Sequence, residues 1–443
     1  MRLAIKILTM LGLGLVVLVP VAMIRGTVQD RQQYQAEAVA EVARSTAREQ
    51  TIAGPVLVVP YTDTIVFELK DSNGKARREV SEQSGTLVYF ADDLALKGQM
   101  RSLPRMRGLY EVRVFELEST LAASFRVTVP RPKEANTTRV LGDPVLGIGI
   151  SDVRGLVGAP TLHVAGRPVV LEQGAGRGNL AGVHATLPVP ALEQPMAFDV
   201  EFRSVLQGTE NLAVAPLATR NRIAIDSPWP HPLFHGDFLP RQREISADGF
   251  RAQWDISSLA SNAQAQARTW LQGGESPVTL QAIGISLVDP VNVYSQVDRA
   301  TKYGMLFVLL TFVAFFVFEH LKQLRIHPIQ YALVGFAVAI FFLLLLALSE
   351  RIAFFEAYAV AAVACVGLIG YYLRHVLGGW MRGAGFAGLL ATLYAALYGL
   401  LISEDNAMVL GAGLLFLILA AIMVLTRKVD WYRATLLPTA PAA

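Results

Sequence analysis

Two apolar regions bracket a long polar middle in this chain of 443 residues. One apolar stretch begins near Ile7 and ends at Ile24, and five more crowd the last third of the chain, between Met305 and Leu425. A bilayer core about 30 Å thick is crossed by about 20 consecutive apolar residues in a helix. No stretch between the two regions is apolar over such a length. This layout predicts a membrane protein with one large domain in water.

Six stretches qualify or nearly qualify as spanning helices: residues 7–24, 305–318, 329–348, 352–372, 386–402 and 408–425. The second is short unless it starts at Lys302 and Tyr303, whose long side chains can reach the membrane surface. The first has a basic start, as a cleaved signal peptide would. Its apolar run of about 18 residues is longer than a usual signal, however, and no clear small-x-small cleavage site follows it. We therefore expect an uncleaved anchor.

Composition supports lipid solvation and excludes several functions. Charged residues make up 17% of the chain, whereas soluble domains carry about 25%. The single cysteine, Cys365, cannot form an intrachain disulfide or a multi-cysteine metal site. The net charge of +3 gives no case for binding nucleic acid.

Orientation follows from the basic residues of the short loops, which are enriched on the cytoplasmic side. With the N-terminus inside, the short outer loops hold only one basic residue, Arg351. The residues then facing the cytoplasm are Arg2, Lys6, Lys322, Arg325, Arg374, Arg382, Arg427, Lys428 and Arg433. We expect both termini in the cytoplasm and residues 25–302 on the other side of the membrane, which is the periplasm if the host is a Gram-negative bacterium.

The chain is expected to have five parts. Residues 1–24 form the anchor helix, and residues 25–50, rich in Ala, Glu, Gln and Arg, form a juxtamembrane helical stalk. Gly54-Pro55 then ends the helix. Residues 51–302 form a β-rich, sandwich-like periplasmic domain, because short β-branched runs separated by turn residues follow. Residues 303–426 form a five-helix transmembrane bundle, and residues 427–443 form a cytoplasmic tail.

Within the β-rich domain we expect antiparallel pairing, a hairpin turn at residues 71–74 and one short helix near residues 257–271. Ser257 or Ser258 would cap that helix. The candidate strands are residues 56–60, 64–69, 85–90, 109–117, 123–129, 161–164, 196–202, 222–226, 250–254 and 278–287.

The most distinctive water-facing segment is the proline-rich loop at residues 228–240. Its alternating prolines, Pro228, Pro230 and Pro232, hold the chain extended. We expect a rigid loop that packs its aromatic side chains on the sandwich or presents them to a partner. The candidate contact residues are Trp229, His231, Phe234, Gly236, Asp237 and Phe238.

The same loop offers a metal site as an alternative, since His231, His235 and Asp237 are close in sequence. Two histidines four residues apart share a face only in a helix, which this segment is not, so we expect no metal. The chain also lacks a zincin helix, a Gly-x-Ser-x-Gly elbow and a kinase motif set. The loops at residues 151–155 and 174–178 are read as loop tips and not as phosphate loops. We expect no enzyme activity and no cofactor.

The junction between domain and bundle is a second candidate site. It contains Asp298, Arg299, Lys302 and Tyr303, and we expect these residues to couple the two parts mechanically.

Four charged residues near the membrane form a candidate polar network: Glu319, Glu350, Arg351 and Glu356. A charge at the bilayer centre costs about 2.5–3.5 kcal/mol on insertion scales. These groups either form a proton or ion relay or pair at the two membrane surfaces. We favour the second reading, because none of them is expected at the centre.

Several segments together resemble the CreD family of inner membrane proteins, over nearly the whole chain. They are Ser227–Pro232 with Phe234 and Gly236–Pro240, Asp298–Tyr303, Phe315–Glu319, His327–Tyr331, Leu345–Glu350 and Asp430–Tyr432. The resemblance implies a bacterial inner membrane protein with a periplasmic domain. It also implies a role in envelope integrity, tolerance of some colicins, and expression under a two-component system connected with β-lactam response. It implies no catalytic residues and no ligand.

The function expected on these grounds is non-catalytic. The periplasmic domain would contact an unknown envelope protein or lipid and so maintain the cell envelope or its stress response. The alternative is a bundle that transports a lipid or small solute, in which case Glu356, with Glu350 and Arg351, would matter most.

Overall fold

The computed structural model describes residues 2–70, 76–176, 181–272, 280–287, 292–321, 326–377, 379–403 and 406–427. The chain divides into two compact units. Residues 1–35 and 291–443 form one, called here the helical unit, and residues 36–290 form the other, the β unit. A large β-rich region therefore follows the first helix, as the sequence predicts. The β unit ends about a dozen residues before the predicted boundary at 302, because Val293–Lys302 is a helix of the helical unit.

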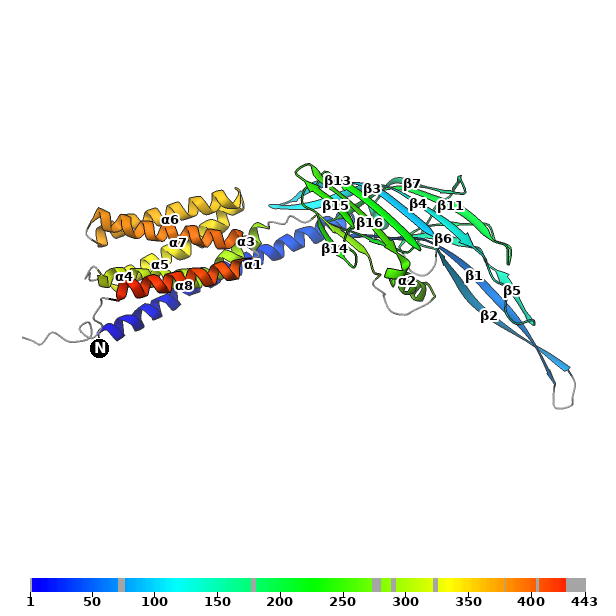
Figure 1. The fold of residues 1–443 in the computed structure, drawn as a ribbon, viewed down its shortest axis with the longest axis horizontal. Coiled ribbons are helices and arrows are strands. Elements are labelled where there is room, and N and C mark those ends of the chain that lie inside the picture. The colour runs from blue at the N-terminus through cyan, green and yellow to red at the C-terminus, as the bar shows by residue number, and fades with distance from the viewer. Residues whose placement is uncertain are drawn as a thin grey trace, which may run out of the picture. The chain divides into compact units, whose positions relative to one another are not determined.

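The β unit is built on two sheets (Figure 1). Among the described residues the first sheet has nine strands, in the order β14-β17-β12-β1-β6-β10-β9, with β2 and β5 also paired to β1. These strands are β1 (Gln50–Lys70), β2 (Ala76–Phe90), β5 (Thr137–Leu141), β6 (Val145–Ile150), β9 (Glu172–Gln173), β10 (Gly182–Thr186), β12 (Asn211–Ala215), β14 (Leu233–Gly236) and β17 (Ile283–Ser286). The predicted turn at residues 71–74 lies outside the described residues, between β1 and β2, which pair antiparallel.

The second sheet has eight described strands, in the order β15-β16-β13-β3-β4-β11-β7-β8. They are β3 (Asp93–Arg107), β4 (Tyr110–Val127), β7 (Leu156–Val164), β8 (Arg167–Val169), β11 (Met196–Thr209), β13 (Arg220–Ser227), β15 (Gln242–Ser246) and β16 (Gly249–Ser257). The expectation of purely antiparallel pairing is wrong in two places, since β1 pairs β12 and β3 pairs β13 in parallel.

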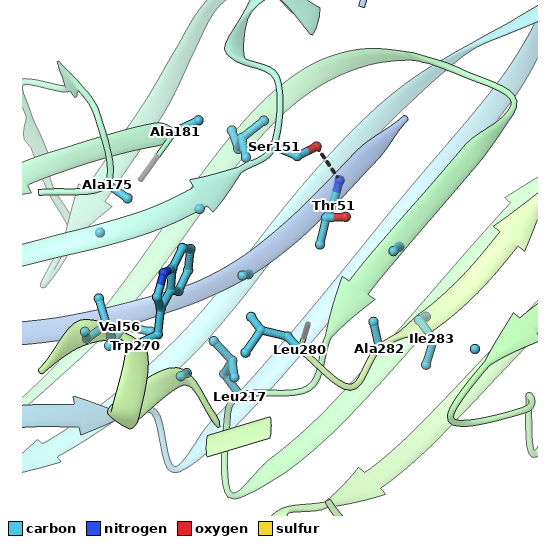
Figure 2. A pocket seen from close by; sticks show the side chains of 18 of the residues that line it. Thr51, Val56, Ser151, Ala175, Ala181, Leu217, Trp270, Leu280, Ala282 and Ile283 are labelled. Carbon is cyan, nitrogen blue, oxygen red and sulfur yellow. Dashed lines mark hydrogen bonds between the residues drawn. The ribbon is translucent and has the colours of Figure 1, made fainter. Parts of the chain in front are cut away.

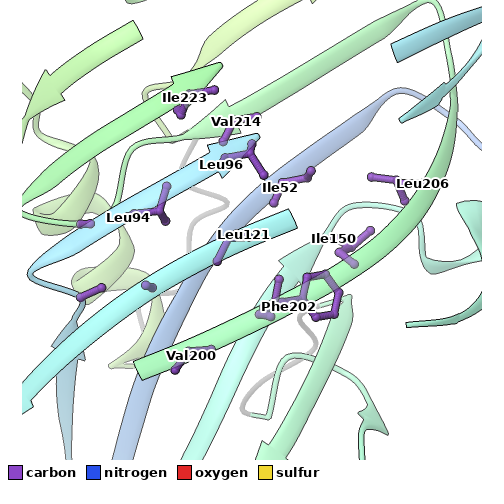
Figure 3. Packing of buried hydrophobic residues seen from close by; sticks show 14 of the residues in the cluster. Ile52, Leu94, Leu96, Leu121, Ile150, Val200, Phe202, Leu206, Val214 and Ile223 are labelled. Carbon is purple, nitrogen blue, oxygen red and sulfur yellow. The ribbon is translucent and has the colours of Figure 1, made fainter. Parts of the chain in front are cut away.

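One hydrophobic core lies between the two sheets (Figure 3). In β16, Phe250, Ala252, Trp254 and Ile256 are buried, whereas the residues between them are exposed. This period of two is what a strand with one face on the core requires. Side chains from the first sheet, such as Ile52 and those labelled from β6 and β12 in Figure 3, meet side chains from β3, β4 and β11 of the second. The domain is therefore a sandwich, as predicted.

The outer face of the first sheet carries the one helix expected in this region. α2 (Ala263–Leu271) buries Ala263 and Ala267 in a small cluster with Val56, Val58 and Leu217. A 3-10 turn, Ser258–Ala260, precedes α2, and the hydroxyl of Ser257 accepts from the backbone N–H of Leu259. The predicted helix is thus shorter than expected, and Ser257 caps the turn before it.

α1 (Arg2–Ser45) is a single helix, as predicted for the anchor and stalk. It ends at Ser45, and Gly54-Pro55 lies inside β1, where the register with β6 shifts between Ala53 and Val56. The expectation that Gly54-Pro55 ends the helix is therefore wrong. Gly54 instead forms a bulge, and its φ of +114° is a conformation that only glycine adopts readily.

The helical unit contains, besides most of α1, the helices α3 (Val293–Lys302), α4 (Gly304–Leu321), α5 (Pro328–Ser349), α6 (Phe354–Val376), α7 (Trp380–Ile402) and α8 (Ala407–Thr426). Among the described residues, four helices are long and apolar enough to cross a membrane, or five if α3 and α4, bent by 43°, count as one span. α8 adds a shorter apolar stretch, Met408–Val424, at the place of the sixth predicted segment.

Candidate functional site

A cleft of about 600 Å³ lies on the outer face of the first sheet, beside α2 (Figure 2). Its floor consists of outward-facing residues of β1, β6, β12 and β17, and its wall includes Trp270 and Leu271 of α2. The floor residues are small. They include Ala53, Ala213 and Gly284. Small side chains on neighbouring strands leave a hollow over a sheet that larger side chains would fill.

The proline-rich loop at residues 228–240, called here the aromatic loop, forms one rim of this cleft. Phe234 packs edge-on against Phe250 and Trp254, with ring centroids 5.5 and 5.7 Å apart. The indole N–H of Trp254 donates to the carbonyl of Phe238 at 3.1 Å. Trp229, Phe234 and Phe238 all pack against the core of the sandwich. The loop therefore holds its aromatic side chains inward, which is the first of the two expected arrangements.

Trp229 and His231 form the outer part of the same loop. The indole N–H of Trp229 donates to the carbonyl of His231 at 2.9 Å, and the two rings meet edge-on at 5.8 Å. The guanidinium of Arg113 lies 4.0 Å from the Trp229 ring centroid. These two residues fix the conformation of the loop but do not line the cleft.

Three consecutive residues of the loop do line the cleft: His235, Gly236 and Asp237. His235 and Gly236 belong to β14, which pairs with β17. The Asp237 carboxylate accepts from the backbone N–H of Ala282 at 3.0 Å, and the Asp237 N–H donates to the Ala282 carbonyl at 2.9 Å. A Cβ on Gly284 would overlap the His235 ring, so glycine there lets the imidazole lie across the sheet.

The candidate metal ligands are not brought together. His235 and Asp237 line the cleft, whereas His231 packs on Trp229. Across the part of the chain that the structure describes, no group of three or more His, Cys, Asp or Glu side chains is placed to hold a metal ion.

A polar cluster adjoins the cleft. It includes residues of the loop 151–155, which we predicted to be a loop tip. Gln50 is 1% exposed, and its amide donates to the carbonyls of Asp152 and Gln207, both at 2.9 Å. The Ser151 hydroxyl, which lines the cleft, donates to the Glu49 carbonyl and accepts from the Thr51 N–H, each at 2.9 Å. The sequence alone does not predict this cluster, because no local pattern indicates that residue 50 contacts residues about 100 or more positions later.

Asp152 anchors this cluster through its charge. Arg154 donates to both of its carboxylate oxygens, at 2.9 and 2.6 Å, and this pairing lowers the pKa of Asp152 to about 2. Arg154 also donates to the carbonyl of Arg44 in the last turn of α1, at 2.8 Å. The guanidinium thereby satisfies a carbonyl that the end of the helix would leave without a partner.

The predicted junction residues lie at α3 and the start of α4. The Asp298 carboxylate pairs with Lys302 at 2.6 Å and with Arg25 of α1 at 3.5 Å. Tyr303 caps the C-terminus of α3 at the 43° bend into α4, and its N–H donates to the Arg299 carbonyl at 3.3 Å. These contacts tie α3 to α1 within the helical unit.

The four candidate membrane charges do not form one network. Glu319 is 3% exposed and accepts from the Tyr331 hydroxyl at 2.8 Å and the Ile326 N–H at 3.1 Å. Glu350 pairs with Arg31 of α1 at 3.2 Å and lies near the Tyr294 hydroxyl. Tyr331 and Glu350 lie at opposite ends of α5, about 29 Å apart along a helix of 1.5 Å rise.

The other two charges of that group are exposed. Arg351 lies in the turn after α5, and its backbone N–H donates to the Leu348 carbonyl. Glu356 lies in the first turn of α6. The structure thus places one carboxylate among buried side chains and keeps the others at helix ends.

Comparisons with known proteins agree over almost the whole chain. The family model described as "Inner membrane protein CreD" matches residues 2–432. The chain is 34% identical over 435 residues to "Inner membrane protein CreD" of Escherichia coli (strain K12), an alignment that covers 97% of this chain and 94% of that protein. A solved M1 zinc metallopeptidase from Deinococcus radiodurans aligns over 80% of this chain and 96% of its own, with 10% identity and a TM-score of 0.20, which is too low to carry an argument.

Proposed function

Because this chain belongs to the CreD family of inner membrane proteins, we propose that it maintains the cell envelope without catalysing a reaction. Its β unit, exported to the periplasm, contacts an envelope component at the cleft. Both termini remain in the cytoplasm, and α1 anchors the β unit.

The cleft is the observation that carries this proposal. Its volume of about 600 Å³ falls in the range of about 300–1,000 Å³ that is typical of ligand pockets. Its rim is held in place by the aromatic loop, whose rings are packed into the core. A rim fixed in this way presents His235 and Asp237 without a loss of loop entropy on binding.

The non-catalytic part of the proposal is supported by the chemistry of the lining. Ser151 is the serine of the cleft, and its hydroxyl bonds to backbone groups and to Gln50. A nucleophilic serine would need a general base within hydrogen-bond reach. The described contacts of Ser151 include no histidine and no carboxylate.

Live-cell photo-crosslinking tests the contact. A photoreactive amino acid replaces Asp237 at the rim of the cleft and, as a matched control, Asp199, an exposed carboxylate on β11 of the second sheet. We expect position 237 to capture an envelope lipid or protein that position 199 does not. Identical adducts at both positions, or none at 237, would contradict the proposal.

Transport through the helical unit is a second candidate function, favoured by one observation, the buried Glu319 beside Tyr331. Ionisable residues within membrane helices are functional candidates by default. If the bundle transports a solute, Glu319 is better placed than the exposed Glu356 to take part. Solute flux into proteoliposomes that is lost in Glu319→Gln and kept in Glu356→Gln would support transport. The absence of flux in the wild type would exclude it for the solute tested.

A further inference from the structure

We propose that the cleft binds the hydrocarbon chain of a membrane phospholipid whose head group carries an ammonium. This inference rests on the proposed function, because it names the chemical class of the envelope component.

The lining favours a hydrocarbon chain. Its larger side chains are apolar and include Val56, Val58, Leu271 and Leu280. Trp270 adds an aromatic wall from α2 (Figure 2). Removing apolar surface from water is the main favourable term when such a lining meets a ligand. A lipid chain offers a ligand that is apolar along its whole length.

The floor disfavours a polar ligand. The Ser151 hydroxyl and the Thr51 N–H that lie there already bond to one another, and the hydroxyl also donates to the Glu49 carbonyl. A sugar or a polar peptide would find these hydrogen-bonding groups already paired, whereas a hydrocarbon chain needs no such partners.

The rim selects the head group. Asp237 is the one residue of fixed charge among the described residues that line the cleft, and it is exposed. Its carboxylate repels a fatty-acid carboxylate or a purely anionic head group and attracts an ammonium. An aminophospholipid supplies both an apolar chain and an ammonium. The chain belongs to a family of inner membrane proteins, so phospholipid is present in the membrane that holds its helical unit.

Photolabelling of the full-length protein in vesicles tests the inference. The vesicles consist of phosphatidylglycerol, whose head group has no ammonium, doped with phosphatidylethanolamine that carries a diazirine on one acyl chain. After irradiation and digestion, labelled peptides are mapped by mass spectrometry. We expect adducts on the peptides that contain Ala213 and Leu271, in addition to those on the membrane helices.

Two variants at the floor and one control separate cleft binding from general labelling. Ala213→Phe and Ala282→Phe fill the cleft from the floor and should lower its labelling at least about tenfold, the change expected when a well-fitting chain is displaced. Ala265→Phe places the same ring on the exposed face of α2, outside the lining, and should label as the wild type does. The adducts on the membrane helices serve as an internal standard, and thermal unfolding confirms that each variant is folded.

The head-group preference is tested by exchanging the probe. Diazirine-labelled phosphatidylglycerol with the same acyl chain should label the cleft less than the phosphatidylethanolamine probe. Asp237→Asn, whose side-chain oxygen can still accept from the Ala282 N–H, should remove that difference.

The outcomes are distinct. Unlabelled cleft peptides, or a cleft labelled equally in the wild type and both floor variants, overturn the inference. Equal labelling by the two head groups overturns its head-group part. If position 237 captures a protein in live cells while the cleft takes no lipid label, the lipid inference fails and the proposed function stands. If neither experiment detects a contact, both fail.

Discussion

The β unit and the helical unit bury their polar side chains in different ways. In the β unit, neutral amides are buried in the interior and bonded to backbone groups. Gln50 is 1% exposed, and Asn221, fully buried, bonds to the N–H and carbonyl of Ala218 and the carbonyl of Ile256. In the helical unit, the buried carboxylate of Glu319 lies near the end of α4, and Glu350 directly follows α5.

The difference follows from the solvent of each unit. Lipid cannot satisfy a charged group, so charges in membrane helices gather near the ends, where water or a partner is within reach. A domain in water can bury an amide wherever strands or loops supply carbonyls and N–H groups to it. Hydropathy therefore locates the polar groups of the helical unit, but only the folded structure locates those of the β unit.

The largest effect is expected at Gln50. This residue is therefore the most severe test of the comparison between the two units. Gln50→Leu keeps the size of the side chain but leaves the carbonyls of Asp152 and Gln207 without this donor. We expect a loss of about 2–4 kcal/mol in the free energy of unfolding of the β unit, from two partly buried acceptors that lose a fully buried donor. Denaturant unfolding of the full-length protein in nanodiscs, followed by hydrogen exchange in β6, measures it.

Gln242→Leu is the matched control for that change, because Gln242 is exposed on the edge strand β15. It should change the free energy of unfolding by less than about 0.5 kcal/mol, as surface substitutions usually do. Similar losses at Gln50 and Gln242 would remove the special role given to the buried amide.

A smaller effect is expected at the buried carboxylate of the helical unit. Glu319→Leu removes the acceptor of the Tyr331 hydroxyl and the Ile326 N–H, and we expect a loss of about 1–3 kcal/mol from a buried donor without a partner. Glu319→Gln keeps an acceptor oxygen and should lose less. Thermal unfolding in nanodiscs measures both, with the exposed Glu356→Leu expected to stay near the wild type. If Glu319→Leu is as stable as the wild type, the carboxylate does not hold these helix ends together.

The smallest effect is expected at Asp152 and depends on pH. Its pKa is lowered from 3.8 to about 2 by Arg154, so the folded state favours the ionised carboxylate. The stabilisation is complete above about pH 4 and is lost as the pH falls toward 2, because protonation removes the pairing. Since Arg154 is half exposed and solvent screens the pair, the loss should be about 1 kcal/mol at most.

Asp152→Asn provides the check, because the amide does not titrate. The difference in free energy of unfolding between the wild type and Asp152→Asn should shrink between pH 4 and pH 2. A difference that stays constant across this interval would mean that the charge of Asp152 does not stabilise the fold.

The sequence predicted those parts of the structure that depend on local patterns. Long apolar stretches identify spanning helices, and the Ala-, Glu- and Arg-rich segment after residue 24 continues α1, because both signals lie within one element. Ser257, predicted as a possible cap of the short helix, caps only the 3-10 turn before it, and the N-cap of α2 is Asn262. β3 was not predicted as a strand, since Gly98 and Pro104 interrupt its alternation, although pairing with β4 and β13 on either side holds it in the sheet.

The cleft could not be predicted, because its parts are distant in sequence. Ala53, Gly149, Ala213 and Gly284 lie on four strands, and only the order β17-β12-β1-β6 places them side by side. The parallel pair β1 and β12 joins residues about 160 positions apart. The composition of the aromatic loop did identify it as a candidate site. Three of its residues, His235, Gly236 and Asp237, line the cleft. His231 does not, because its place on the loop is set by the Trp229 ring.

Cysteine accessibility at the rim of the cleft tests the central claim most directly. Cys365 is the sole cysteine of the chain and is buried, so a Cys365→Ser background gives no signal of its own. In that background, Asp237→Cys is treated in intact cells with a maleimide that cannot cross the inner membrane. We predict full labelling without lysis, and weaker labelling when Ala213→Phe is added. Labelling that appears only after the cells are lysed would place the cleft in the cytoplasm and contradict the account.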